Sequence, residues 1–301
     1  MNYLVLGGNG FIGSHLVKAL QHCGNVRVFD HTINKDFLEN HRIDCVEGDF
    51  SNYRFHNLLD NIDVVYHLIS TTIPCNGTEN LKEEIHQNVM PTIRFLDTMI
   101  EKDVNKIIFS SSGGTIYGDV RGELTEKLPL NPICSYGVQK LTIEKALDLY
   151  RRYHGLNAIS VRISNPYGSG QYTGRKQGVV SFFANLIKKG LPIEVWGDGS
   201  NVRDYIHIDD VIDALRVIEK YNGLETVFNI ASGERFSINQ IIEKICIKLE
   251  VDVGIIFKEK RYCDVQENCL SAKLLYNECG WKPKINFEEG LTRLTNSELM
   301  F

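Results

Sequence analysis

The first half of the chain alternates short apolar runs with longer stretches in which apolar residues recur every three or four positions. Residues 3–6 are an apolar run that ends at Gly7-Gly8, and residues 11–20 then carry apolar side chains at helical spacing. A short apolar run is typical of a buried parallel strand, and the spacing after it is typical of a helix. Similar runs lie near residues 26–29, 43–46, 64–68, 107–110 and 158–163, with helical stretches over 80–102 and 141–153. This alternation predicts an α/β fold with a doubly wound parallel sheet over residues 1–165.

The chain after Asn165 follows a different pattern, in which short apolar segments are separated by many glycines. We predict a smaller, loop-rich C-terminal lobe over residues 166–301, of which about 203–232 would pack back on the first domain. Ligands of doubly wound sheets bind at the carboxyl ends of the strands. We therefore expect a substrate-binding cleft between that edge of the sheet and the second lobe.

Composition and charge narrow the function classes. The 301 residues carry a formal charge of −5, which offers no basic field for nucleic acid. No apolar run approaches the roughly 20 residues of a membrane-spanning helix. The eight cysteines are irregularly spaced without a C-x-x-C pair, and His207 with Asp209 and Asp210 is interpreted as a strand end followed by an aspartate helix cap. We predict a cytoplasmic protein with reduced cysteines and with no metal, nucleic acid or membrane partner.

The first glycine-rich turn matches a dinucleotide-binding motif, because residues 8–13 fit G-x-G-x-x-G between a strand and a helix. The predicted cofactor contacts in this turn are Gly7, Gly10, Phe11, Ile12 and Gly13. The glycines allow a tight turn and close approach of a pyrophosphate, and the helix N-terminus attracts its charge. Asp30 ends the next strand, where a carboxylate binds the ribose diol and would repel a 2′-phosphate. We therefore predict a Rossmann domain that binds NAD rather than NADP.

Tyr136 and Lys140 form a Y-x-x-x-K pair at the start of a predicted helix. Side chains four residues apart lie on one helix face. A tyrosine has an ordinary pKa of about 10, and a lysine cation together with a positive nicotinamide ring would favour its phenolate. Tyr136 is therefore the candidate catalytic base, assisted by Lys140. An exposed helical tyrosine is the alternative interpretation of this motif taken alone.

Together with the glycine turn and the strand ending in Ser110-Ser111-Ser112, the Tyr-Lys pair makes the pattern specific. The chain resembles the extended short-chain dehydrogenase/reductase family, and within it the NAD-dependent nucleotide-sugar epimerases and dehydratases. The resemblance runs nearly end to end. The matching segments are residues 7–13, 48–50, 67–68, 88–89, 117–118, 136–140, 162–168, 196–199, 203–210, 228–230, 261–264 and 280–283.

The resemblance implies binding roles on both sides of the cleft. On the cofactor side, Asp49 and Phe50 would border the adenine, and Leu68, Asn88 and Ser110 lie in the other cofactor-contacting segments. On the substrate side, the implied residues are Asn165, Arg203 and Arg261 for the diphosphate, Asp264 for the ribose, and Asn268 where the family adjusts room for the C2 substituent. Arginine suits this role because it makes charge-assisted, bidentate bonds to phosphate oxygens.

One position departs from the family pattern. The hydroxyl residue expected four positions before Tyr117 is Gly113, so either Ser112 or Thr115 would supply the hydroxyl contact with the sugar. Thr115 would share a strand face with Gly113. Gly114 and Thr115 also stand where sugar 4,6-dehydratases carry an Asp-Glu pair for the elimination of water, which argues against a dehydratase.

The sequence thus predicts an isomerase, an NAD-dependent 4-epimerase of a nucleotide-activated sugar with UDP sugars favoured, of the kind used in polysaccharide biosynthesis. Tyr136 would take the proton of the sugar's 4-hydroxyl during transient oxidation at C4, while the arginines keep the diphosphate fixed. Two alternatives stay open: a nucleotide-sugar reductase or dehydrogenase that uses the same pair, and a non-catalytic NAD-binding scaffold. By the same resemblance, a homodimer would form through the helix that carries Tyr136.

Overall fold

A parallel β-sheet organises the first part of the molecule. The computed structural model describes residues 1–33, 43–72, 81–171, 178–262 and 264–297. Its seven-stranded sheet has the order β11-β7-β5-β4-β1-β2-β3, and every neighbouring pair is parallel. The strands are β1 (Asn2–Leu6), β2 (Asn25–Asp30), β3 (Asp44–Glu47), β4 (Val64–His67), β5 (Lys106–Ser112), β7 (Asn157–Ile163) and β11 (Val227–Ile230). On one side of β1 lie β2 and β3, and on the other side lie β4, β5, β7 and β11, each in chain order. The predicted doubly wound Rossmann sheet is therefore confirmed.

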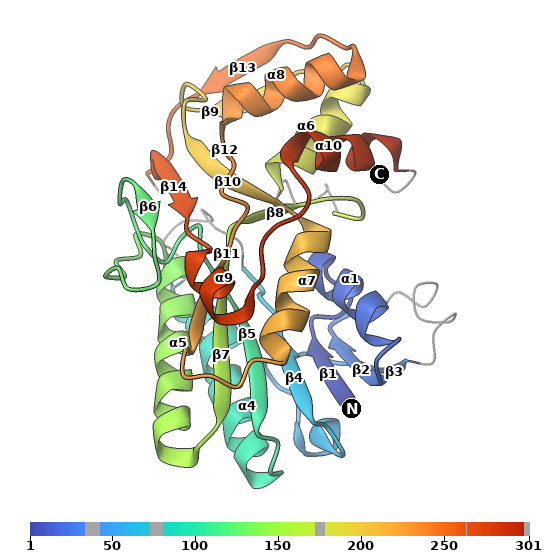
Figure 1. Cartoon of the computed structure of the whole chain (residues 1–301), viewed down its shortest axis with the longest axis vertical. Helices are drawn as coiled ribbons and strands as arrows, with labels where there is room; N and C mark the ends of the chain where they lie inside the picture. The colour runs from blue at the N-terminus through green and yellow to red at the C-terminus, as the bar shows by residue number, and fades with distance from the viewer. Residues whose placement is uncertain (34–42, 73–80, 172–177, 263, 298–301) are drawn as a thin grey trace.

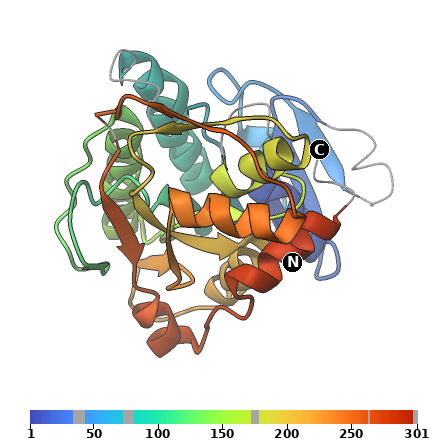
Figure 2. The same ribbon diagram turned by 90° about the horizontal axis from the view of Figure 1, so that it is seen from above.

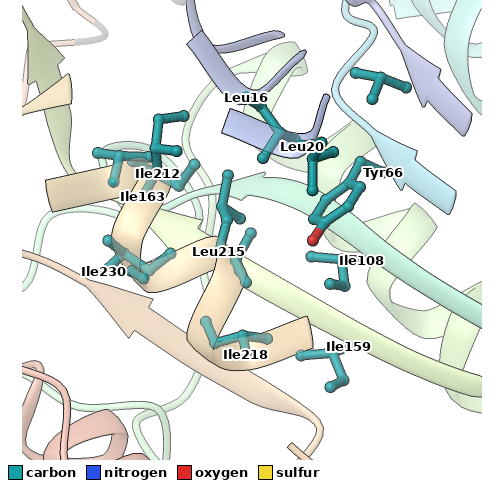
Figure 3. Close-up of a cluster of buried hydrophobic side chains, with 14 of the residues drawn as sticks. Leu16, Leu20, Tyr66, Ile108, Ile159, Ile163, Ile212, Leu215, Ile218 and Ile230 are labelled. Atoms are coloured by element: carbon teal, nitrogen blue, oxygen red, sulfur yellow. The ribbon is translucent and has the colours of Figure 1, made fainter. Parts of the chain in front are cut away.

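Helices cover both faces of this sheet. One face carries α1 (Phe11–Leu20) and α7 (Ile208–Glu219), and the other carries α4 (Met90–Glu101) and α5 (Ser135–His154). Figure 3 shows the first interface, where Leu20 of α1 and Leu215 of α7 point toward Tyr66 and Ile108 of the sheet. Each fully buried side chain of this kind contributes roughly 1.5–3 kcal/mol, so the two layers are held together by apolar burial.

A second, smaller lobe lies beyond the carboxyl ends of the strands, at the end of the molecule away from the N-terminus (Figure 1). Its main sheet has the order β12-β10-β14-β6 with β8 paired to β10, and β13 and β9 form a separate two-stranded sheet. The strands are β6 (Glu123–Leu124), β8 (Asn165–Tyr167), β9 (Ile193–Trp196), β10 (Val202–His207), β12 (Arg235–Ser237), β13 (Ile255–Lys258) and β14 (Glu267–Leu270). The helices are α6 (Val179–Lys188), α8 (Ile238–Leu249) and α10 (Phe287–Asn296), and α8 and α10 lie side by side when the lobe is seen from above (Figure 2).

The chain crosses between the two parts more than once. α7 and β11, both within 203–232, belong to the Rossmann layers. α9 (Lys273–Cys279) also packs there, with Trp281 buried in the same apolar cluster. The division at residue 165 stays a prediction, but these crossings tie the second lobe to the sheet at several points.

Several local features differ from the sequence expectation. The helix expected over 80–102 consists of α3 (Leu81–Glu84), the π-helical turn η2 (Ile85–Val89) and α4. A short 3-10 helix, η1 (His56–Leu59), precedes β4. The sequence analysis predicted an aspartate as the N-cap of α7, and this prediction is wrong. The N-cap is His207, whose ring nitrogen Nδ1 accepts from the main-chain N–H of Asp209 at 3.2 Å. Within the described ranges, every helix is too short or too polar to cross a bilayer.

Candidate active site

The turn between β1 and α1 packs closely against its own main chain at Gly13. Gly7 has a φ of +84°, and a Cβ on Gly13 would lie 2.1 Å from the carbonyl oxygen of Gly7. A Cβ on Gly10 would meet only that same oxygen, at 3.3 Å. The first main-chain N–H groups of α1, which begins at Phe11, have no acceptor within the helix, as at every helix start. No side chain caps them, so those of residues such as Ile12 can face a ligand. A glycine cradle at a helix N-terminus fits a dinucleotide pyrophosphate.

Asp30 lies beside this turn at the end of β2. Its carboxylate accepts main-chain N–H bonds from Asn9 at 2.9 Å and from His31 at 2.7 Å. Arg27, on the same strand, bonds instead to Asp44 and to the main-chain carbonyl groups of residues 57, 58 and 60. The guanidinium of Arg27 is therefore bonded away from Asp30 and is not placed to bind a 2′-phosphate. This arrangement favours a cofactor with an unphosphorylated ribose.

The residues expected along the rest of the cofactor follow β3 and β4. Asp49 is exposed, and hydrogen bonds from Ser51 hold the pKa of its carboxyl below the ordinary value. The ring of Phe50 is buried in an aromatic cluster of the core, so only its main chain can border a ligand. Leu68 follows β4 directly, and its main-chain N–H donates to the carbonyl of Leu6 at 2.9 Å.

Tyr136 and Lys140 lie in the first turns of α5, against the end of β5. The ammonium group of Lys140 donates to the carbonyl oxygen of Ser110 at 2.8 Å and lies 5.6 Å from the ring centroid of Tyr136. Gly137 lets the helix approach the segment after β5, because a Cβ there would lie 2.8 Å from the carbonyl oxygen of Thr115. The fold therefore brings four residues that the sequence singled out to one place.

Burial acts on both members of this pair. It raises the pKa of Tyr136 to about 12, although a hydrogen bond with Ser70 acts in the opposite direction. It also lowers the pKa of Lys140 to about 7, although the nearby carboxylate of Glu144 opposes the change. In the structure as it stands, burial is the largest influence on the pKa of Tyr136. That Lys140 and a bound nicotinamide ring together favour the phenolate stays a prediction.

The segment that follows β5 is a turn rather than a continued strand. The pairing of β5 with β7 stops at Ser112, so Thr115 does not share a strand face with Gly113, contrary to expectation. A Cβ on Gly113 would lie 2.2 Å from a terminal carbon of the Leu270 side chain, so a larger residue there would have to displace Leu270. Ser112 is half-buried at the end of the strand, whereas Thr115 Oγ1 is buried without a hydrogen-bond partner in the described parts of the chain.

β10 and β14 bring the expected substrate residues together. Arg203 and Asn268 are direct partners in the parallel pairing of these strands. The guanidinium of Arg203 donates to two main-chain carbonyl groups, at 2.8 and 2.7 Å, and burial lowers its pKa. Arg261 donates two hydrogen bonds of 2.9 Å to the carboxylate of Asp264. Both charged groups lie close enough to Arg203 to act on its pKa. Two arginines and a carboxylate therefore form one cluster.

The remaining substrate-side residues adjoin this cluster. Asn165 donates from its side chain to the carbonyl oxygen of Asp204 at 2.8 Å. The sequence assigned no role to Trp196, yet its ring is 45% exposed and its centroid lies 5.4 Å from the guanidinium carbon of Arg261. Its position in the matching segment 196–199 was the signal that could have identified it.

Asn88 is hydrogen-bonded to Thr71, in a segment for which no role was predicted. Its Oδ1 accepts from the main-chain N–H of Thr71 at 3.0 Å, and its Nδ2 donates to the hydroxyl of Thr71 at 2.8 Å. Ser70, in the same segment, donates from its hydroxyl to the carbonyl oxygen of Thr72 at 3.0 Å. The run Ser70-Thr71-Thr72 directly after a buried strand was the available signal.

A Rossmann sheet with a tyrosine and a lysine one turn apart on α5 is the architecture of a short-chain dehydrogenase/reductase. The chain belongs to the NAD-dependent epimerase/dehydratase family, whose model matches residues 3–231. It is 33% identical to dTDP-4-dehydro-6-deoxyglucose reductase of Escherichia coli, with 98% of this chain and 96% of that one covered. It is 31% identical to a putative UDP-glucose 4-epimerase of Methanocaldococcus jannaschii, with 97% of each chain covered.

Solved structures give the same assignment. The UDP-glucose 4-epimerase of Thermotoga maritima with UDP-glucose superposes with a TM-score of 0.92 at 30% identity, over 97% of each chain. The Thermus thermophilus UDP-glucose 4-epimerase in complex with NAD gives a TM-score of 0.91 at 28% identity, over 98% of this chain and 97% of that one. The predicted family, fold and cofactor are thereby confirmed. The relatives include both epimerases and a reductase.

Proposed function

We propose that the protein is a 4-epimerase of a nucleotide-activated hexose or N-acetylhexosamine, with a UDP sugar as substrate. The observation that carries this proposal is the Tyr136–Lys140 pair beside a floor of two glycines, Gly113 and Gly114. A Cβ on Gly114 would meet only the hydroxyl of Ser112, at 3.9 Å, so there is room for a sugar ring to turn. The floor also lacks the acid and base groups that elimination of water needs. Likeness to UDP-glucose 4-epimerases over nearly the whole chain supports the same reaction.

The reacting hydroxyl would be handled by α5 and the turn after β5. Tyr136 accepts the proton of the sugar's 4-hydroxyl and returns it at the end of the cycle, and Lys140 keeps a positive charge next to the phenol. Thr115, whose buried Oγ1 is without a partner among the described residues, would hold the same hydroxyl. Ser112 is the alternative donor. NAD, when bound, supplies the acceptor and donor of hydride at C4.

The nucleotide would be held away from the reacting carbon. Arg203 and Arg261 bind the diphosphate, Asp264 accepts from the ribose, and Asn165 adds a side-chain amide at the same end. Firm binding there lets the 4-keto sugar turn over without leaving the protein, so that hydride returns to its opposite face. Interactions with the non-reacting part of the substrate thus keep the intermediate in place.

The direct test is incubation of the purified protein with UDP-glucose, UDP-galactose, UDP-N-acetylglucosamine and UDP-N-acetylgalactosamine. NMR of the products should show interconversion of one C4 pair without net change in the near-ultraviolet absorbance of reduced nicotinamide. Tyr136→Phe is the matched control and should lose that activity. Failure to interconvert any of these sugars would contradict the assignment.

The second candidate is a C4 reductase, favoured by the 33% identity to the Escherichia coli reductase over nearly the full length. The same tyrosine would then donate a proton to a 4-keto group. Incubation with dTDP-4-dehydro-6-deoxyglucose and reduced nicotinamide distinguishes the two reactions. A reductase consumes one reduced cofactor for each product molecule, whereas an epimerase recycles its cofactor.

The outer side of α5 supports the predicted homodimer. Leu149 is 54% and Tyr153 is 78% exposed on this helix. Large apolar side chains of this kind on one exposed helix favour burial against a second copy. Leu149→Asp and Tyr153→Asp should each shift the sedimenting species toward a monomer, and Lys145→Asp at an exposed position of the same helix offers a comparison.

A further inference from the structure

A buried network of hydrogen bonds joins α5 to the turn after β5. Arg162, on β7, is 3% exposed and pairs with Glu144 of α5, from Nε to Oε1 at 3.1 Å and from Nη2 to Oε2 at 2.7 Å. Its third nitrogen, Nη1, donates to the hydroxyl of Tyr117 at 3.0 Å. The guanidinium therefore bridges two elements that carry candidate catalytic groups, namely α5 with Tyr136 and the turn with Thr115.

The phenol of Tyr117 is fixed from its other side as well. Its hydroxyl donates to Oδ1 of Asn229, on β11, at 2.7 Å, and its ring is fully buried. The guanidinium carbon of Arg162 lies 5.1 Å from the centroid of this ring. Asn229 is itself held, because its Nδ2 donates to the carbonyl oxygen of Leu124 at 2.9 Å. The hydroxyl of Tyr117 thus accepts one hydrogen bond and donates its only proton in another, which gives the side chain one defined position.

The turn that ends at Tyr117 also packs against α5 next to the candidate base. A Cβ on Gly137 would lie 2.8 Å from the carbonyl oxygen of Thr115, so the turn approaches the helix one residue after Tyr136. A displacement of Tyr117 would carry Thr115, two residues earlier, with it. Because an error of about 1 Å in the placement of reacting groups can cost about 100-fold in rate, the position of Tyr117 matters to the chemistry.

The charges of this network fit a role in positioning better than a role in stability. Burial of the Arg162–Glu144 pair removes two charges from water, and well-packed apolar side chains in their place are often as stable. The pair does provide fixed directions, because both oxygens of Glu144 are bonded to a planar guanidinium. One turn earlier on α5, the ammonium group of Lys140 donates to the carbonyl oxygen of Ser110 at 2.8 Å. The network therefore fixes the same helix that holds the catalytic pair.

We propose that Tyr117 is a positioning residue, which together with Arg162 holds the turn after β5 at a fixed distance from Tyr136. It is buried away from the sugar and acts through Thr115 or Ser112. This inference rests on the proposed function, in which that turn contacts the reacting hydroxyl of the sugar.

The first test compares kcat and KM of Tyr117→Phe with those of a matched control, Tyr66→Phe. Tyr66 is also fully buried, and its hydroxyl donates to the carboxylate of Glu219 at 2.8 Å, on the sheet face covered by α1 and α7. Both variants lose one buried hydroxyl and should lower Tm to a similar extent. Only Tyr117→Phe should lower kcat, by about tenfold, with KM for the UDP sugar and Kd for NAD changed by less than about twofold. A wild-type kcat in Tyr117→Phe, or an equal loss in both variants, would overturn the proposal.

A double-mutant cycle separates positioning from a general loosening of the core. Thr115→Ala and Ser112→Ala are each combined with Tyr117→Phe. In the background that removes the group contacting the sugar, Tyr117→Phe should lower kcat by less than about twofold, because there is no longer a hydroxyl to position. The full tenfold loss in both backgrounds would mean that Tyr117 does not act through either hydroxyl.

Hydrogen exchange followed by mass spectrometry gives a readout that does not depend on turnover. Tyr117→Phe should speed exchange at least about threefold in peptides that cover residues 112–118 and 135–144, whereas Tyr66→Phe should leave both at the wild-type rate. Unchanged exchange in these two peptides overturns the positioning role, even if kcat falls. Faster exchange in both, in a protein that converts none of the sugars, supports Tyr117 and overturns the proposed function alone.

Discussion

The side-chain amide of Asn268 donates to the carbonyl oxygen of Gly113 at 3.0 Å. This bond joins β14 of the second lobe to the turn after β5, where the sugar is expected to react. Asn268 is 1% exposed, and Arg203 is its partner on the adjoining strand. The residue therefore lies between Arg203, the proposed diphosphate ligand, and the glycine floor.

This position changes what we expect from Asn268→Tyr. If Asn268 adjusts the room for the C2 substituent, as the family resemblance implies, a tyrosine there would selectively lower activity on N-acetylated sugars. Because the side chain is buried and bonded to Gly113, a tyrosine has to displace the glycine turn, so we expect turnover to fall by about tenfold or more on all sugars. Measurement of kcat/KM on plain and N-acetylated UDP sugars checks this, with Asn268→Gln as the milder comparison. A loss confined to the N-acetylated pair would restore the original hypothesis.

The role of Lys140 can be tested on its own helix. Its ammonium group is buried and bonded to the carbonyl of Ser110. Lys140→Met should lower kcat by about 100-fold, because the phenol of Tyr136 then loses the adjacent positive charge. Lys145→Met, at an exposed position of α5, should leave kcat unchanged. Equal rates in the two variants would remove Lys140 from the mechanism.

The glycine cradle gives a prediction with two separable readouts. A Cβ on Gly13 would lie 2.1 Å from the carbonyl oxygen of Gly7 and 2.7 Å from the Cα of Gly8, both main-chain atoms. Gly13→Ala should therefore lower Tm as well as the affinity for NAD. Gly10→Ala meets a single atom at 3.3 Å, so it should keep Tm while raising the Kd for NAD by at least about tenfold, or about 1.4 kcal/mol. Calorimetric titration with NAD and a thermal melt of each variant check both statements.

The Rossmann half was predictable because its signals are local. The buried strands, the glycine turn, Asp30 and the Tyr136–Lys140 spacing are each legible within a few residues, and the fold brings them together. The second lobe was not predictable in detail, because strands as short as β6 (Glu123–Leu124) are defined only by pairing with β14, far along the chain. The bond between Asn268 and Gly113 spans 155 residues and left no pattern in the sequence.

The pKa of Tyr136 shows a further limit of the sequence. The spacing correctly placed a lysine beside the phenol, but the desolvation that dominates both groups comes from the whole surrounding structure. At Lys140 the nearby carboxylate of Glu144 opposes burial, whereas at Tyr136 the nearby charges act in the same direction as burial. Which of these holds is fixed by packing that no motif encodes. The sign of the effect therefore had to come from the three-dimensional structure.

Asp204 should make the stability of the protein depend on pH. It is fully buried on β10 and accepts from the main-chain N–H groups of Ser232 at 3.0 Å and Gly233 at 2.6 Å. Burial raises the pKa of its carboxyl from 3.8 to about 6. Because the folded protein binds this proton more tightly than the unfolded chain, the contribution is fully present below about pH 4 and is lost as pH rises to about 6. The difference amounts to about 3 kcal/mol.

Urea unfolding at a series of pH values between 4 and 7 measures this dependence. Asp204→Asn should flatten the decline in the free energy of unfolding between about pH 4 and 6, because an amide does not titrate there. Asp252→Asn, at an exposed position before β13, should keep the wild-type slope. An equal slope in wild type and Asp204→Asn would mean that the carboxyl is ionised in the folded protein throughout this range, and that its two main-chain bonds outweigh its burial.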